Sequence, residues 1–219
     1  MISEKLNHRL DNVLARIAQI IFGKNVHPHF LTFMGLFINV GAAVCLGMGY
    51  WVIGGCLIIL AGFFDISDGA VARVSNKETS FGGFLDSVVD RYSDIVLLIG
   101  IIWYYAKGGE SGYIFLACIV LMGCILIPYT RAKAEVFINR CNIGLMERAE
   151  RTIFLAMGSI FNVMNFVLWI LAILTHITVI QRIYYAWKEM QKPEEPTANH
   201  YLELTGNPNK KRNGVYKES

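Results

Sequence analysis

Three long stretches of this sequence lack charge. Residues 31–64 and 111–130 contain no charged side chain, and residues 152–181 contain a single titratable group, His176. Runs of this length are typical of membrane-spanning helices. As one helix, residues 31–64 would be about 50 Å long, against a hydrocarbon core of about 30 Å. This run therefore has to break into two spans, and the pattern Gly-Met-Gly-Tyr-Trp at residues 47–51 is the expected break.

The same reasoning, applied to the whole chain, predicts an all-α integral membrane protein with six transmembrane helices. Charged residues make up 17% of the sequence, against roughly 25% in a soluble domain. Of the basic residues, only Lys107 falls in a loop on the far side of the membrane, which places both termini in the cytoplasm. The expected spans in the cell membrane are residues 29–49, 51–75, 80–106, 112–137, 147–161 and 166–187, the last two forming a hairpin that turns near residues 162–165.

The two ends of the chain differ from its centre. Apolar residues recur every three or four positions from Ile2 to Ile21, with basic residues on the other faces. This pattern predicts an amphipathic helix over residues 1–24 that lies in the membrane interface. Residues 25–190 then form the six-helix transmembrane domain. The polar residues 191–219 are expected to be a disordered cytoplasmic tail.

Four aspartates flank the junction between the second and third spans. Asp65 and Asp68 are three positions apart, and Asp86 and Asp90 are four apart, so each pair shares one face of a helix. On two antiparallel helices that meet near residue 77, the outer two aspartates lie at matching depth, and so do the inner two. We therefore expect all four carboxylates to converge just below the cytoplasmic surface.

Four converging carboxylates cannot all remain ionised in a low-dielectric site unless cations neutralise them. A set of oxygen ligands without His or Cys favours Mg²⁺ or Mn²⁺ over zinc. Two such ions, roughly 3.5–4 Å apart, would polarise a phosphoryl group. Gly69, Gly82 and Gly83 leave the backbone beside the acids open to a nucleotide and its pyrophosphate, and Arg73 can reach a phosphate.

The pattern D-x2-D-G-x2-A-R-x8-G-x3-D-x3-D in this region resembles the signature of the CDP-alcohol phosphotransferase family. Its eight fixed positions are all present, at Asp65, Asp68, Gly69, Ala72, Arg73, Gly82, Asp86 and Asp90. The resemblance extends over about residues 1–190. It implies that an alcohol displaces CMP from a CDP-linked substrate, and that the protein is a homodimer.

Roles for individual residues follow from the same resemblance. It implies that Asp65, Asp68 and Asp86 bind metal, and that Asp90 accepts the proton of the attacking hydroxyl and also contacts a metal. The residues expected to bind the CDP-lipid are His29, Thr32, Asp65, Asp68, Gly69, Ala72, Arg73, Thr79 and Gly82.

Other segments of the sequence indicate which alcohol is the acceptor. Residues 85–94, 129–135, 147–151 and 178–182 resemble the branch of the family that makes phosphatidylinositol phosphate or its archaeal ether-lipid counterpart, although Pro128 stands where that branch more often has Ser. Arginine offers bidentate contacts to phosphate. Basic residues at cytoplasmic span ends also fit a simple role in topology. The expected ligands of the acceptor phosphate are Arg131, Lys133, Arg148, Arg151 and Arg182.

The reaction expected from these features transfers a phosphatidyl group, or its ether-lipid equivalent, from CDP-diacylglycerol or a CDP-archaeol-type lipid to inositol phosphate. Glycerol 3-phosphate, free inositol and serine are rival acceptors. A divalent-cation transporter would also carry carboxylates within its spans, but it would need polar groups along the whole path. A lipid-binding protein without catalysis would not need Asp90. Membrane lipids are expected partners, and nucleic acid is not.

Overall fold

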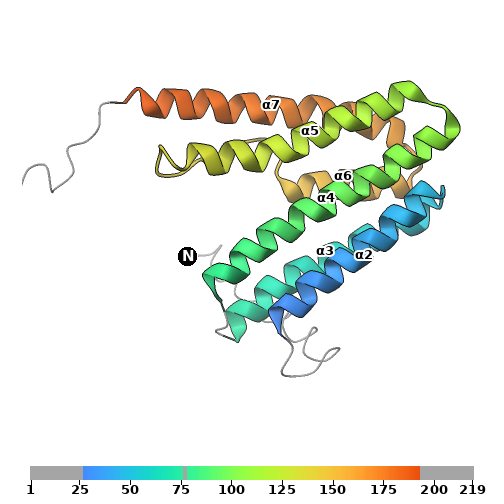
Figure 1. Cartoon of the computed structure of the whole chain (residues 1–219), viewed down its shortest axis with the longest axis horizontal. Coiled ribbons are helices and arrows are strands. Elements are labelled where there is room, and N and C mark those ends of the chain that lie inside the picture. Colours follow the sequence, from blue (N-terminus) through green and yellow to red (C-terminus); the bar gives the residue numbers. More distant parts are fainter. Residues whose placement is uncertain (1–26, 76–77, 193–219) are drawn as a thin grey trace, which may run out of the picture.

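The computed structural model describes residues 27–75 and 78–192, which form six α-helices and, within these ranges, no strand (Figure 1). The predicted interfacial helix and all but the first two residues of the predicted tail lie outside the described residues. The helices are α2 (Pro28–Gly47), α3 (Trp51–Val74), α4 (Ser80–Gly108), α5 (Ser111–Ala134), α6 (Arg148–Ile160) and α7 (Met164–Met190).

The positions of the helices agree with the predicted spans to within three residues at every boundary. The break in the first uncharged run is confirmed between α2 and α3, where Gly49 has φ 88°, a conformation that glycine adopts without strain. The predicted turn between the last two spans is also confirmed. It contains Asn162 with φ 56°, and asparagine is among the residues that tolerate this left-handed region.

Four of the six helices are long and apolar enough to cross a membrane: α2, α3, α5 and α7. The other two differ for physical reasons. α4 has 29 residues but carries four charged side chains between Asp86 and Asp94, whereas α6 has only 13 residues. The described part of the chain is thus an all-helical membrane protein.

The helices pack as two groups, which are joined both by the contact of α4 with α5 and by α6. α2 packs against both α3 and α4, α5 packs against α7, and α6 contacts α3 and α7 (Figure 1). Although α3 and α4 are consecutive in sequence, they make scarcely any direct backbone contact in the described residues. The space between them is therefore available to the side chains that the two helices direct toward each other.

The contact between α2 and α4 depends on Gly100. A Cβ atom at this position would lie 2.3 Å from the carbonyl oxygen of Ala43, well inside the contact distance. We expect Gly100→Ala to lower the free energy of unfolding by about 1–3 kcal/mol, because the two backbones must separate. Thermal unfolding of the purified protein in detergent would measure this loss. Gly41→Ala is the matched control, since a Cβ at Gly41 has no neighbouring atom within 4 Å, and an unchanged melting temperature in Gly100→Ala would contradict the prediction.

Candidate active site

Three acidic side chains from two helices meet between α3 and α4. Asp65 and Asp68 of α3 and Asp86 of α4 each offer a carboxylate oxygen, and these oxygens lie within 4.8 Å of one another. Asp68 is buried, and the hydroxyl of Thr32 on α2 donates a hydrogen bond to its Oδ2 at 2.5 Å. Oxygen ligands at this spacing suit a hard divalent cation such as Mg²⁺ or Mn²⁺, whose charge would offset the repulsion among the three carboxylates.

The start of α4 brings its acid to this place. Thr79 caps the helix, because its hydroxyl oxygen accepts a hydrogen bond of 2.9 Å from the backbone N–H of Gly82. Gly82 and Asp86 then lie one turn apart on the same face. A Cβ at Gly82 would be 3.0 Å from Thr79 Oγ1 and 3.2 Å from His29 Cε1, so glycine lets α4 begin close to the first turn of α2.

A cavity of about 180 Å³ lies beside the acids, at the ends of α2, α3 and α4. The structure gathers around it eight of the nine residues expected to bind the CDP-lipid; the ninth, Asp65, does not line it. We call it the nucleotide cavity. Its lining residues are Pro28, His29, Thr32, Asp68, Gly69, Ala72, Arg73, Glu78, Thr79, Gly82, Gly83 and Asp86.

Asp90 faces Arg148 beside the other acids. The group of three acids does not include it, and its Oδ1 forms an ion pair of 2.8 Å with Arg148 Nη1. The same guanidinium nitrogen also donates to Asp65 Oδ2. Arg148, at the start of α6, therefore bridges α3 and α4 at the edge of the acidic group.

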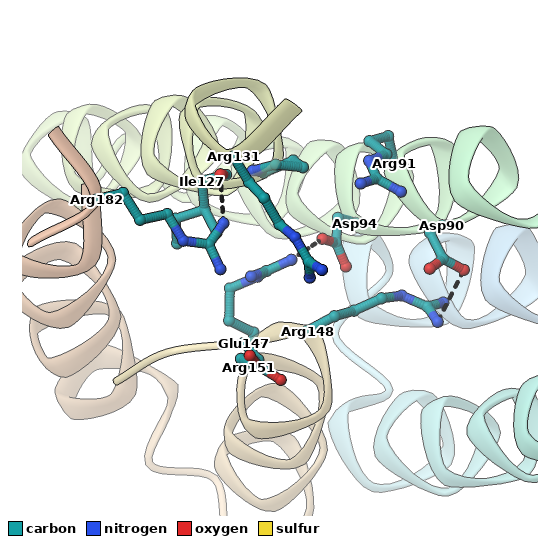
Figure 2. A pocket seen from close by; sticks show the side chains of 10 residues that line it. Asp90, Arg91, Asp94, Ile127, Arg131, Glu147, Arg148, Arg151 and Arg182 are labelled. Atoms are coloured by element: carbon teal, nitrogen blue, oxygen red, sulfur yellow. Dashed lines mark hydrogen bonds and ion pairs between the residues drawn. The ribbon is translucent and has the colours of Figure 1, made fainter. Parts of the chain in front are cut away.

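A second cavity, of about 170 Å³, has Asp90 and Arg148 among its lining residues (Figure 2). Four of the five basic residues expected at the acceptor phosphate line it, and we call it the arginine cavity. Lys133 does not line it; its Nζ lies over the ring of Phe137, 5.6 Å from the centroid. The lining residues are Asp90, Arg91, Asp94, Ile127, Pro128, Arg131, Glu147, Arg148, Arg151 and Arg182.

Arg182 bonds to the end of α5 and to the segment that follows it. Its Nε donates to the carbonyl of Ile143 at 2.9 Å and its Nη1 to that of Ile127 at 2.5 Å. Thr178, one turn earlier on α7, accepts a hydrogen bond of 3.1 Å from Met146 N. These bonds fix residues 135–147, between α5 and α6, against α7. Sequence reasoning could not find this role, because carbonyl partners leave no pattern of side chains.

Asp94 is a further residue of this region that sequence reasoning did not single out. It extends the four-residue spacing of Asp86 and Asp90 by one turn of α4, and its Oδ2 pairs with Arg151 Nη2 at 2.6 Å. That spacing is the signal that could have identified it. Pro28, Glu78 and Glu147 also line the cavities without having been predicted, and no comparable pattern marks them.

An apolar cavity of about 570 Å³ adjoins the acids on a third side. It lies among α2, α3, α4 and α6, with Ile58, Phe63 and Leu97 in its wall. Asp65 and Asp90 line its polar end. The acids thus have three cavities around them: the nucleotide cavity, the arginine cavity and an apolar cavity.

Comparison with known proteins agrees with this geometry. Residues 25–181 match the model of the CDP-alcohol phosphatidyltransferase family. The chain is 34% identical over 188 residues to an archaetidylinositol phosphate synthase of Pyrococcus horikoshii, a match that covers 85% of this chain and 97% of that protein.

Two solved structures of the phosphatidylinositol phosphate synthase of Mycobacterium tuberculosis share the fold at 29% identity. One, with CDP-DAG bound, has a TM-score of 0.74 and covers 82% of this chain and 96% of that one. The other, in complex with manganese and citrate, has a TM-score of 0.75 and covers 81% and 90%. With its complete motif, its acidic group and a family match over most of its length, this chain belongs to the CDP-alcohol phosphatidyltransferase family.

Proposed function

We propose that this protein transfers a phosphatidyl group, or its ether-lipid equivalent, from a CDP-lipid to a hydroxyl of inositol phosphate and releases CMP. The observation that carries the proposal is the arrangement of two cavities about one helix face. Asp86 lines the nucleotide cavity, and Asp90, one turn further along α4, lines the arginine cavity. A donor and a phosphorylated acceptor bound in these cavities would meet at the acids. The names of the relatives support the same donor and acceptor.

The reaction follows from this placement. The CDP group lies in the nucleotide cavity, where Gly83 leaves open space beside the backbone and Arg73 can contact the phosphates. The acceptor hydroxyl forms a bond to the lipid-linked phosphorus, the P–O bond to the CMP phosphate breaks, and Asp90 takes the hydroxyl proton. A divalent metal ion bound by Asp65, Asp68 and Asp86 would neutralise the charge of the phosphoryl group. The relative that contains manganese supports this assignment, and we infer two such ions.

The apolar cavity supports a lipid donor in particular. Its polar end meets Asp65, while its wall is made of residues such as Ile58 and Leu97. We infer that hydrocarbon of the donor occupies this space, with the pyrophosphate at the acids. A water-soluble nucleotide donor would leave the cavity without a function.

We further infer how the protein is placed in the cell membrane. The proposed arrangement has six spans, including α4 and α6, an interfacial helix over residues 1–24, a polar tail over residues 191–219, and both termini in the cytoplasm. The distribution of Lys and Arg supports this orientation. The resemblance to the family supports a homodimer.

One assay tests the function. Purified protein in detergent would receive radiolabelled CDP-diacylglycerol, Mg²⁺ or Mn²⁺, and either inositol phosphate, glycerol 3-phosphate, inositol or serine, and release of CMP would be followed. We expect release with inositol phosphate, its loss on addition of EDTA, and its return with Mn²⁺. If no alcohol exceeds the metal-free control, the protein is not this enzyme. If CMP is released with glycerol 3-phosphate and not with inositol phosphate, the proposed acceptor is wrong.

Replacement of arginines in the arginine cavity tests the acceptor site. Arg148→Ala and Arg182→Ala are each expected to raise the KM for inositol phosphate by about tenfold, with a smaller fall in kcat, because each removes a cation that lines the cavity. Lys133→Ala is the matched comparison, since Lys133 lies nearby but outside the cavity. If all three changes raised the KM for inositol phosphate equally, the effect would come from the loss of positive charge in this region and not from the loss of a ligand in the cavity.

A further inference from the structure

Asp94 and Arg151 form an ion pair that the mechanism leaves without a role. Asp94 lies on α4, and Arg151 lies on the first turns of α6. Arg151 Nη2 donates to Asp94 Oδ2 at 2.6 Å, and the two side chains are only 4% and 10% exposed. Both line the arginine cavity, and Figure 2 marks their ion pair with a dashed line.

A carboxylate is an unexpected neighbour for a bound phosphate. Its negative charge opposes the anion, so its presence in the wall of this cavity requires a reason. Burial supplies one, since an arginine shielded from water needs a partner. Without Asp94, the guanidinium of Arg151 would lose the acidic partner that it has among the described residues.

The pair does not use all the donors of the arginine. A guanidinium has five N–H groups in a fixed plane. Arg151 directs Nη2 to Asp94, whereas its buried Nε has no hydrogen-bond partner within residues 27–75 and 78–192. Bonding capacity therefore remains on the guanidinium, and a ligand in the cavity would reach it at a terminal nitrogen rather than at the buried Nε.

The other arginines of the cavity are held differently. Arg182 is bound to two backbone carbonyls, and Arg148 contacts Asp65 and Asp90. Arg131 is 45% exposed and pairs with Glu135, itself 33% exposed, so that pair is largely in water. Arg151 alone among these four combines near-complete burial with a single carboxylate partner.

We propose that Asp94 is a positioning residue for the acceptor: its carboxylate fixes the plane of the Arg151 guanidinium, and the remaining donors bind the phosphate of the acceptor. The proposal rests on the proposed function, in which this phosphate occupies the arginine cavity. A cation that is already ordered binds with less loss of side-chain freedom than one that must first be ordered. An acceptor without a phosphate gains nothing from this arrangement. Asp94 thereby contributes to the choice of inositol phosphate over free inositol.

Asp94→Asn tests the proposal, because asparagine keeps the shape and removes the charge. In the full-length protein with CDP-diacylglycerol and Mn²⁺, we expect the KM for inositol phosphate to rise at least about tenfold. The KM for the CDP-lipid should stay within about twofold. Arg151→Gln should have a similar effect, and the double variant should be no worse than the more affected single one, because Asp94 acts through Arg151. Glu135→Gln is the matched control, since it removes a carboxylate from the exposed pair at the same cavity and should change neither KM beyond about twofold.

A binding measurement that needs no turnover completes the test. Millimolar inositol phosphate should raise the melting temperature of the wild-type protein, and Asp94→Asn should abolish this increase. If Asp94→Asn does not fold, Asp94→Glu takes its place, because it keeps the charge and moves the carboxylate by one methylene. An unchanged acceptor KM, effects that multiply in the double variant, or failure of both Asp94 variants to fold would overturn the proposal and assign the pair to stability.

Failure of the proposed function has a different signature. It would appear in the wild-type protein, as no CMP release with inositol phosphate. If glycerol 3-phosphate is used instead, the same variants are measured with that acceptor, because the role of Asp94 depends only on the phosphate. A raised KM for glycerol 3-phosphate in Asp94→Asn would then support the positioning role while the named acceptor is rejected.

Discussion

Asp68→Asn is expected to lower metal-dependent CMP release by at least about a thousandfold, equivalent to about 4 kcal/mol in the barrier. The change removes one negative charge from a group of three acids whose oxygens lie within 4.8 Å of one another. The amide oxygen can still accept the hydrogen bond from Thr32, so the packing of α2 against α3 is retained. Initial rates at saturating Mn²⁺, together with Mn²⁺ affinity from electron paramagnetic resonance, would measure the effect.

The control for this experiment is Glu150→Gln. Glu150 is an exposed acid in the first turn of α6, close in sequence to Arg148 but outside every cavity described above. Its replacement should leave the rate and the Mn²⁺ affinity within about twofold. If Asp68→Asn retained both quantities as well, Asp68 would not be a metal ligand.

Asp90→Asn is expected to lower kcat by about 10²–10⁴-fold while binding of the CDP-lipid is retained. Asp90 lies outside the group of three acids and lines the polar end of the apolar cavity but not the nucleotide cavity, so the residues expected to bind the CDP group are unchanged. Arg148 keeps its contact with Asp65. The kcat would come from CMP release, and donor binding from the increase in melting temperature with CDP-diacylglycerol.

Two results would contradict this role. A rate near that of the wild type would remove Asp90 as the proton acceptor. A parallel loss of donor binding and Mn²⁺ affinity would instead place Asp90 among the metal ligands, as the resemblance to the family also implied. Ser87→Ala is a suitable control, since Ser87 lies on the same helix, is exposed and lines none of the three cavities.

The helices and the acidic group could be predicted because they depend on local geometry. Long uncharged runs limit where a helix can begin and end in a membrane, and a spacing of three or four residues places side chains on one face. Asp65, Asp68 and Asp86 meet for this reason. Asp90 meets Arg148 instead, a residue 58 positions away in the sequence. This contact depends on how α6 packs against the other helices, and no local pattern in the sequence predicts that packing.

Lys133 shows that resemblance to a segment of related enzymes does not tell which of its side chains face a cavity. It lies two positions from Arg131 in the segment that resembles related enzymes, and both were expected at the acceptor phosphate. Residues two apart on a helix face in nearly opposite directions. Only Arg131 lines the cavity, and Lys133 contacts Phe137. Helix geometry, applied to the motif, would have separated the two residues in advance.

The first residue of α6 explains why this helix can be so short. Arg148 contacts Asp65, which lies nine residues before the end of α3, or about 14 Å along its axis. At its other end α6 reaches Gly55, near the beginning of α3. The segment before α6 therefore reaches the level of Asp65, and Arg182 and Thr178 bond its backbone at Ile143 and Met146. In the proposed membrane arrangement, a water-soluble acceptor would reach the lipid-linked phosphate from the cytoplasmic side, and the lipid would react without leaving the bilayer.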